Sequence, residues 1–233
     1  MQSDQIKILE DWGEILVVFK PVGWLTVPGR GNHESTPVLS HVLGEQLRNG
    51  RQKSDKDLFV IHRLDQGTSG VILFARSQAA HRALSLLFES RNVLKTYLCL
   101  VKGTPIDQTI KVPIFKLLSK KIKSVVSEKG KKAQTIINTI SSHDGISLVQ
   151  ATPLTGRSHQ IRVHLAHVGS PLLGDPLYGG PEDYKGIPLP YPLLHASEIA
   201  FEWPMGTKRH AIAKPIGNFL EISKGLSNGL FDR

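Results

Sequence analysis

The sequence has 233 residues, of which 40% are hydrophobic and 21% are charged, a balance that is ordinary for a globular protein. Its 29 lysines and arginines outnumber its 20 acidic residues. This excess favours a polyanionic partner, because phosphates attract basic side chains and their binding releases counterions. No signal-peptide-like start and no apolar run of membrane-spanning length occurs, and the one cysteine, Cys99, cannot form an internal disulfide. Secretion and membrane insertion are therefore not expected, and the sequence predicts a cytoplasmic protein.

The first third of the chain predicts a strand and then a helix. Residues 14–20 (EILVVFK) predict a strand, which the following proline ends. Thr36 and Pro37 predict the N-cap and the first residue of a helix, whose apolar side chains recur at helical spacing until Gly50 closes it. The polar stretch 51–57 predicts a solvated connection.

The most informative stretch is VIHRLDQGTSGVILF, residues 60–74. The apolar runs 58–61 and 71–75 predict buried strands, so Arg63 and Asp65 are expected in a short glycine-containing loop between them. Two interpretations of Asp65 are open at this point. Its carboxylate could bond its own backbone in an Asx turn, or it could act as a nucleophile or base that a cation keeps ionised.

The middle of the chain continues with a helix and a strand. Ser77 predicts the N-cap of the second helix. Residues 95–103 predict a strand on which Tyr97, Cys99 and Val101 share one face, because side chains alternate along a strand. From these residues alone, Tyr97 is expected in the core with its hydroxyl satisfied at the edge.

A lysine-rich stretch follows, from residue 115 to residue 132. It predicts an exposed hairpin or loop, and Lys120, Lys121 and Lys123 are candidates for contact with phosphates. No aromatic residue alternates with these lysines, so a platform for base stacking is not expected. The alternative is a solvated surface without a partner.

Residues 135–140 and 146–152 predict two strands joined by a hairpin turn at residues 143–145. The segment TGRSHQIRVHLAHVG then predicts a helix from an N-cap at Ser158 to about Val168. Three histidines on this helix raise the possibility of a metal site, but no cysteine or carboxylate is suitably spaced nearby, and a metal site is not predicted.

The C-terminal third predicts an irregular, proline-rich loop at 181–192, a final strand at 193–201 and a short helix at 216–224. Because the strands cluster instead of alternating strictly with helices, we expect an α+β fold. Neither an internal repeat nor a linker is evident, which predicts a single domain over 1–233.

Three segments resemble motifs of the pseudouridine synthases, in the RluA-like branch that modifies ribosomal and transfer RNA. HRLDQGTSG resembles the motif HRLD-x-x-TSG, GRSHQIRVHL resembles G-R-x-HQIR-x-HL, and Lys95-x-Tyr97 stands at the expected distance between them. The resemblance runs from about residue 11 to about residue 220. It implies that Asp65 is the catalytic carboxylate, that Tyr97 lies against the target base and that Arg162 pairs with Asp65.

The resemblance also implies a mixed, mostly antiparallel central sheet with flanking helices and an active-site cleft. We expect a monomer that acts on an RNA stem-loop with neither a cofactor nor an obligatory protein partner, and no N-terminal RNA-binding domain before residue 11. Isomerising uridine neither oxidises nor adds anything, so no cofactor is required. The candidate RNA-binding residues are Arg63, Arg157, His159, Lys120, Lys121 and Lys123.

Two other classes of protein fit these residues less well than a pseudouridine synthase does. A glycoside hydrolase also acts on a glycosidic bond, but it normally needs a pair of carboxylates, and the loop supplies only Asp65. A non-catalytic RNA-binding module would account for the positive charge. It would not account for the combination of Asp65, Tyr97 and Arg162.

Overall fold

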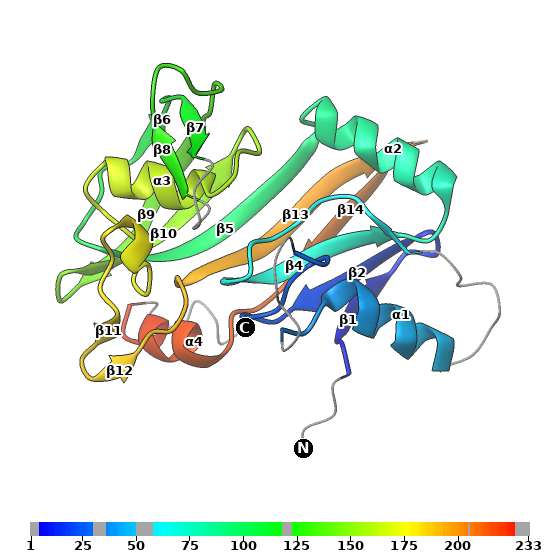
Figure 1. Cartoon of the computed structure of the whole chain (residues 1–233), viewed down its shortest axis with the longest axis horizontal. Coiled ribbons are helices and arrows are strands. Elements are labelled where there is room, and N and C mark those ends of the chain that lie inside the picture. Colours follow the sequence, from blue (N-terminus) through cyan, green and yellow to red (C-terminus); the bar gives the residue numbers. More distant parts are fainter. Residues whose placement is uncertain (1–4, 30–35, 50–57, 118–122, 205, 227–233) are drawn as a thin grey trace. The chain divides into compact units, whose positions relative to one another are not determined.

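The structure, a computed structural model, describes residues 5–29, 36–49, 58–117, 123–204 and 206–226. The chain divides into two compact units. The first unit contains Met1–Leu94 and Ala196–Ala213, and the second contains Lys95–His195 and Lys214–Arg233. Figure 1 shows the whole chain coloured along the sequence.

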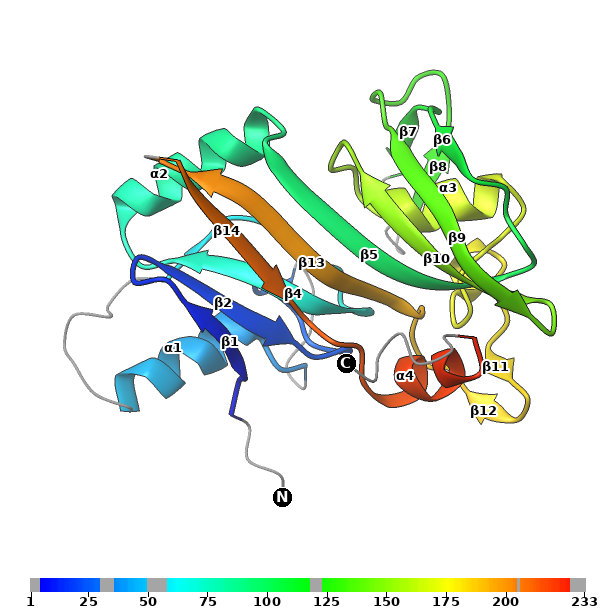
Figure 2. The ribbon, with the colours of Figure 1, turned by 180° about the vertical axis from the view of Figure 1, so that it is seen from behind.

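The first unit is built on strands in the order β1–β2–β4–β13, with β3 beside β4 and β14 beside β13 (Figure 2). The β1–β2, β2–β4, β3–β4 and β13–β14 pairs are antiparallel. The strands are β1 (Ile8–Asp11), β2 (Ile15–Lys20), β3 (Phe59–Val60), β4 (Thr68–Ala75), β13 (Leu194–Trp203) and β14 (Thr207–Ile212). Every residue of β2 is buried, so both of its faces are covered, and most of β4 is buried as well.

Two helices belong to the first unit, α1 (Leu39–Asn49) and α2 (Gln78–Glu89). Gln46 of α1 holds the chain just before β1, since its amide group accepts a bond from the Ile6 N–H at 2.6 Å and donates one to the Ile6 carbonyl at 3.0 Å. Ser77 is the N-cap of α2, as predicted, and its hydroxyl accepts the Ala80 N–H at 3.1 Å.

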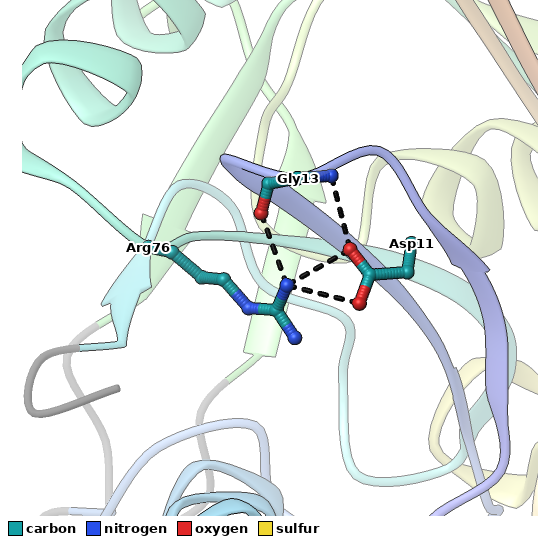
Figure 3. Close-up of polar contacts among 3 residues, drawn as sticks. All are labelled: Asp11, Gly13 and Arg76. Atoms are coloured by element: carbon teal, nitrogen blue, oxygen red, sulfur yellow. Dashed lines mark hydrogen bonds and ion pairs between the residues drawn. The ribbon is translucent and has the colours of Figure 1, made fainter. Parts of the chain in front are cut away.

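Arg76, which follows β4, fixes the turn that joins β1 to β2 (Figure 3). One terminal nitrogen of its guanidinium lies 2.8 and 2.9 Å from the two carboxylate oxygens of Asp11 and 3.0 Å from the Gly13 carbonyl oxygen. The Gly13 N–H in turn donates to Asp11 at 3.0 Å. The β1–β2 hairpin is therefore joined to the end of β4. This strand follows the loop of residues 61–67, called the HRLD loop below.

The second unit has strands in the order β5–β10–β9–β6, and each of these three pairings is antiparallel. These strands are β5 (Val93–Lys102), β6 (Gln108–Ile110), β9 (Thr135–His143) and β10 (Ile146–Pro153). Two small hairpins are added, β7 (Ile114–Leu117) with β8 (Lys123–Val126) and β11 (Asp183–Tyr184) with β12 (Ile187–Pro188). The helices are α3 (Gln160–His167), α4 (Gly217–Lys224) and the short 3₁₀ helix η1 (Pro176–Tyr178).

The second unit has hydrophobic side chains packed on both faces of β5. Leu98 and Leu100 belong to a cluster that includes residues of α4, whereas Cys99 and Val101 belong to one that includes residues of α3. Tyr97 packs against the second cluster, so the predicted common face of Tyr97, Cys99 and Val101 is confirmed. The turn between β9 and β10 has positive φ at Asp144 (49°) and Gly145 (73°), which is typical of the predicted tight hairpin.

The α+β prediction is confirmed: within the described residues, each unit combines two α-helices with strands whose assigned pairings are antiparallel. Among the same residues, no helix has the length and apolar character that crossing a bilayer would require. The expectation of a single catalytic domain stays a prediction.

Several local predictions were wrong. Helix α1 begins at Leu39 and not at Pro37, because the chain just before it bridges to Leu25: the Leu25 N–H donates to the Pro37 carbonyl and the Leu39 N–H to the Leu25 carbonyl. Strand β3 is half-buried, since it pairs with β4 alone. The loop predicted at 181–192 contains the β11–β12 hairpin, and β14 follows the strand that was expected to be the last.

Strands β1 and β6 were not predicted, since each is short and carries mostly exposed side chains. The solvated connection predicted at 51–57 lies outside the described residues.

Candidate active site

In the first unit, the candidate site is the loop between β3 and β4 that carries Asp65. Its side chains alternate in exposure: Arg63 is exposed, Leu64 is buried and Asp65 is half-buried. This alternation gives the loop an apolar anchor and leaves the two charged side chains accessible.

Thr26 fixes the backbone of Leu64 from both sides. Its hydroxyl accepts the Leu64 N–H at 3.2 Å and donates to the Leu64 carbonyl at 3.0 Å. Gln66 is fixed to Gly23 in a similar reciprocal way, through the Gly23 N–H at 2.9 Å and the Gln66 side-chain amide at 3.1 Å. The residues on both sides of Asp65 are thus bonded to the segment that follows β2.

Lys20 also fixes the backbone of this loop. It is the last residue of β2, its side chain is fully buried, and its ammonium donates to the carbonyl oxygens of Thr68 (2.7 Å), Pro21 (3.0 Å) and Gln66 (3.3 Å). A lysine ammonium has three N–H donors, so these three acceptors match its capacity. Lys20 therefore fixes Gln66 and Thr68, the second and last residues of the turn that begins at Asp65.

The charge of Asp65 also acts on Lys20 within the first unit. Burial lowers the pKa of Lys20 from its ordinary value of 10.5 to about 7, while the Asp65 carboxylate acts in the opposite direction. A carboxylate raises the proton affinity of a nearby amine because it favours the charged form of that amine. The sequence pattern missed this role because a lysine between a strand and a proline is typical of a solvent-exposed strand end.

Two further contacts fix the position of this motif on the sheet. The Leu73 N–H donates to His62 Nε2 at 3.0 Å, and the His62 ring stacks on Phe88 of α2 with centroids 4.8 Å apart. Gly70 has φ of 119°, and a Cβ atom at this position would lie 2.1 Å from the Ala196 carbonyl oxygen. Only glycine fits there, which explains the glycine that ends the TSG sequence.

In the second unit, the candidate site is the start of α3. Arg162 forms a bidentate ion pair with Asp175, with distances of 2.7 Å from Nε to Oδ2 and 2.6 Å from Nη2 to Oδ1. Asp175 is 1% exposed and Arg162 is 12% exposed, so the pair is largely shielded from water. The guanidinium also lies over the Tyr178 ring, with its central carbon 4.9 Å from the centroid of the ring.

Helix α3 begins at Gln160, and its N-cap position is His159 and not Ser158 as predicted. The residue before it, His159, has a left-handed backbone with φ of 55° and makes no capping bond. The buried side chain of Gln160 instead fixes the segment before the helix, since its Oε1 accepts the Arg157 N–H at 3.0 Å and the Thr155 hydroxyl at 2.7 Å. The left-handed residue was not evident from the sequence, because positive φ is uncommon in any residue other than glycine.

His159, just before α3, and Arg162 within it both contact Tyr178. His159 Nδ1 lies 2.8 Å from the Tyr178 hydroxyl. Arg157 is half-buried, and its Nε donates to the Lys132 carbonyl at 3.1 Å. Lys123 lies 5.8 Å from the centroid of the Tyr178 ring. Lys120 and Lys121 lie outside the described residues.

His164, in the middle of α3, has structural surroundings. His164 is fully buried, and its ring nitrogens bond to the Thr135 hydroxyl at 2.8 Å and the Val112 carbonyl at 3.1 Å. Desolvation lowers its pKa, which favours the neutral ring. Within the part of the chain that the structure describes, no group of three or more potential ligands could hold a metal ion.

The structure thus places Asp65 in the first unit, and Tyr97 and Arg162 in the second. The pairing of Arg162 with Asp65 stays a prediction. Sequence reasoning missed Lys20, Thr26, Asp175 and Tyr178.

Comparison with known proteins agrees with these motifs. Residues 14–167, more than half of the chain, match the family model described as RNA pseudouridylate synthase. The chain is 38% identical over 201 residues to "Dual-specificity RNA pseudouridine synthase RluA" of Yersinia pestis, a match that covers 84% of this chain and 92% of that protein. It is 35% identical over 207 residues to the protein of the same name from Escherichia coli (strain K12), covering 87% and 90%.

A further relative is longer. "Ribosomal large subunit pseudouridine synthase D" of Buchnera aphidicola is 36% identical over 216 residues, and the match covers 86% of this chain but 66% of that protein. Among solved structures, "Human RNA Pseudouridylate Synthase Domain Containing 1" is 25% identical with a TM-score of 0.73, covering 95% and 88% of the two chains. "Human RNA Pseudouridylate Synthase Domain Containing 4" is 24% identical with a TM-score of 0.76, covering 94% and 92%, and supports the fold.

The family match spans Asp65, Tyr97 and Arg162, and the identities to the two bacterial RluA proteins extend over nearly their full lengths. The chain therefore belongs to the RNA pseudouridylate synthase family, a family of isomerases that act on RNA.

Proposed function

We propose that this protein converts specific uridines of structured RNA to pseudouridine, with Asp65 as the catalytic carboxylate. The observation that carries the proposal is the family match over residues 14–167, which includes the HRLD loop. The contacts of this loop support the role of Asp65. Lys20 and Thr26 fix its backbone on both sides and leave the carboxylate half-buried, as a group that must meet a substrate requires.

The reaction moves the bond between sugar and base from N1 to C5 of the uracil. The C1′–N1 bond breaks, the base turns over, a C1′–C5 bond forms and the proton on C5 leaves, while N1 gains a proton. Atoms and electrons balance without an oxidant, a reductant or a second substrate. Asp65 has three chemically reasonable routes: covalent attack on the sugar, covalent attack on the base, or removal of a sugar proton. Each route needs the ionised carboxylate.

We assign the two other site residues by the resemblance of their motifs. Tyr97 stacks on the target base and accepts the C5 proton late in the reaction. Arg162 orients Asp65 and keeps it ionised. The bidentate bond to Asp175 supports this role, because it holds the guanidinium rigidly and uses two of the five N–H groups of an arginine.

We further propose that the substrate is a compact stem-loop, either a transfer RNA arm or a hairpin of large-subunit ribosomal RNA. The names of the relatives, a dual-specificity RNA synthase and a large-subunit synthase, support this choice. A uridine in folded RNA must leave its stack at a cost of a few kcal/mol. Arg63, whose side chain is exposed next to Asp65, is our candidate for occupying the space that the uridine leaves.

Affinity would come from basic side chains that contact phosphates, with Arg157, His159, Lys120, Lys121 and Lys123 as our candidates. We also propose that the protein works in the cytoplasm as a monomer, without an obligatory protein partner. The fully buried Cys99 is compatible with a reducing compartment, since burial raises the pKa of its thiol and keeps it unreactive.

The substrate proposal can be tested by deleting the gene and mapping pseudouridines across total RNA by carbodiimide-dependent primer extension. We expect one or a few sites in transfer RNA or large-subunit ribosomal RNA to disappear. The wild-type gene should restore them, and Asp65→Ala should not. If every site in stable RNA persists after the deletion, the proposed substrate is wrong.

A further inference from the structure

Three segments of the second unit meet at Tyr178, the last residue of η1. From the lysine-bearing β7–β8 hairpin, the Ser124 N–H donates to the Tyr178 hydroxyl at 2.9 Å. From the residue that precedes α3, His159 Nδ1 lies 2.8 Å from the same oxygen. From α3 itself, the guanidinium of Arg162 lies over the ring. Helix α3 is in contact with β8, as Figure 1 also shows.

The ring of Tyr178 and the carboxylate of Asp175 jointly fix the position of the Arg162 guanidinium. Both residues come from one short turn, which the bond from the Tyr178 N–H to the Asp175 carbonyl closes at 3.0 Å. The carboxylate sets the plane of the guanidinium through two bonds, and the ring lies 4.9 Å from its central carbon. A planar cation with a bidentate partner and an aromatic partner loses most of its rotational freedom.

The hydroxyl of Tyr178 has a different task, because it bonds to the hairpin. Ser124 is fully buried, and its N–H lies in the middle of β8, between Lys123 and Val125. Around this contact, Ile114 of β7 packs in one small cluster with Val163 of α3, and Tyr178 borders the cluster. The hydroxyl is therefore a polar attachment of the β7–β8 hairpin, next to the apolar contact between Ile114 and Val163.

We infer that Tyr178 is a positioning residue with two separable roles: its ring orients Arg162, and its hydroxyl fixes the β7–β8 hairpin and His159 for contact with the substrate. The inference rests on the proposed function for the identity of the substrate as RNA. It implies that removing the hydroxyl weakens substrate binding, whereas removing the ring also slows the chemical step.

The size of each effect follows from the contacts that are lost. When the hairpin is loosened, the loss of binding free energy cannot exceed the free energy that the lost hydrogen bond contributed to ordering it. A neutral hydrogen bond changes an equilibrium by about three- to tenfold. Tyr178→Phe should thus raise KM by about three- to tenfold and change kcat by less than about twofold. Tyr178→Leu should raise KM similarly and lower kcat by about tenfold or more, because Arg162 loses the ring against which it is oriented.

The experiment compares these two variants with the wild type on one RNA that the protein modifies. Tyr184→Phe is the matched control, since it removes a tyrosine hydroxyl from β11 in the same unit. Hydrogen exchange of the Ser124 amide, followed by NMR, reports directly on the attachment and should be faster in Tyr178→Phe but not in the control. If Tyr178 had a purely structural role, both variants would have a lower melting temperature. The effect on KM in Tyr178→Phe and the additional effect on kcat in Tyr178→Leu would then not be seen.

Unchanged KM and unchanged Ser124 exchange in Tyr178→Phe would overturn the inference. If Tyr178→Leu does not fold, Tyr178→Met tests the role of the ring, and an unchanged kcat in a folded aliphatic variant would overturn that part. Failure of the proposed function is distinguishable, because the wild type would then form no pseudouridine. Ser124 exchange and RNA affinity would still decide whether the hydroxyl attaches the hairpin.

Discussion

The ammonium nitrogen of Lys20 lies 2.7 Å from the carbonyl oxygen of Thr68, across the turn that begins at Asp65. A buried lysine thus connects the end of β2 to the start of β4 and lies within electrostatic reach of Asp65. Because a charged amine is costly to bury, the contact makes the stability of the fold dependent on pH.

The pH dependence has a defined direction. Below pH 7, Lys20 is protonated in both the folded and the unfolded state. Between its folded pKa of about 7 and its ordinary value of 10.5, the unfolded state binds more protons, so the free energy of unfolding rises with pH. Each tenfold change in proton affinity contributes about 1.4 kcal/mol.

Lys20→Met should remove this rise. We expect the stability of the wild type relative to Lys20→Met to increase by a few kcal/mol between about pH 7 and pH 10. Urea unfolding followed by circular dichroism at several pH values measures the difference. The contribution of Cys99 to the pH dependence cancels, because both proteins contain this cysteine. Stability curves that stay parallel over this range would show that Lys20 does not titrate as described.

Asp175→Asn should destabilise the second unit and slow catalysis. The substitution leaves Arg162, which is 12% exposed, without its ionised partner, and breaking a buried ion pair costs about 3–5 kcal/mol. Asp183→Asn is a charge-matched control, because Asp183 is exposed on β11. Thermal unfolding and kcat should both fall for Asp175→Asn and stay near wild type for the control. Equal melting temperatures for the two variants would contradict the importance of this pair.

Gly70→Ala should be much more damaging than Gly145→Ala. Both glycines have positive φ, but a Cβ atom at residue 70 would lie 2.1 Å from the Ala196 carbonyl oxygen, whereas nothing lies within 4 Å at residue 145. The control therefore loses about 1–2 kcal/mol from backbone strain alone, and Gly70→Ala more than about 3 kcal/mol. Denaturant unfolding measures both, and similar losses would show that the close approach to Ala196 is not a constraint.

Replacing Lys120, Lys121 and Lys123 together by glutamine should weaken RNA binding and flatten its dependence on salt. Each phosphate contact that is lost lowers the slope of log affinity against log salt concentration by about 0.7 to 0.9. The control replaces the exposed residues Lys7, Lys208 and Lys224, which changes the net charge equally. If both triple variants bind with the same slope, the lysine-rich stretch is a solvated surface and not a phosphate contact.

The sequence predicted well those features that depend on local pattern. Strand β2, helix α2 with its cap at Ser77, and the hairpin turn at Asp144 and Gly145 all follow from periodicity and from residues with strong conformational preferences. The HRLD loop was also located correctly, because two apolar runs bounded by glycine and serine leave little choice.

The contacts that shape the candidate site could not be predicted in the same way. Lys20 and Thr68 are separated by 48 residues, and Gly70 requires glycine because of the backbone at Ala196. Arg162 and Asp175 are 13 residues apart with a turn between them. Such pairs depend on how the chain returns to itself, which neither propensity nor spacing contains. The N-cap predicted at Ser158 was wrong for a related reason, since a tertiary network around Gln160 replaced the local signal.

The role of Asp65 is the central claim and can be measured directly. RNA labelled with tritium at C5 of uridine, prepared from a strain that lacks the gene, releases tritium when pseudouridine forms. We expect the wild type to release it and Asp65→Asn to release none above background. The variant should keep its fold and bind the RNA with similar affinity, because basic side chains supply most of the affinity and the carboxylate acts in the chemical step. Tritium release by Asp65→Asn at the rate of the wild type would contradict the account.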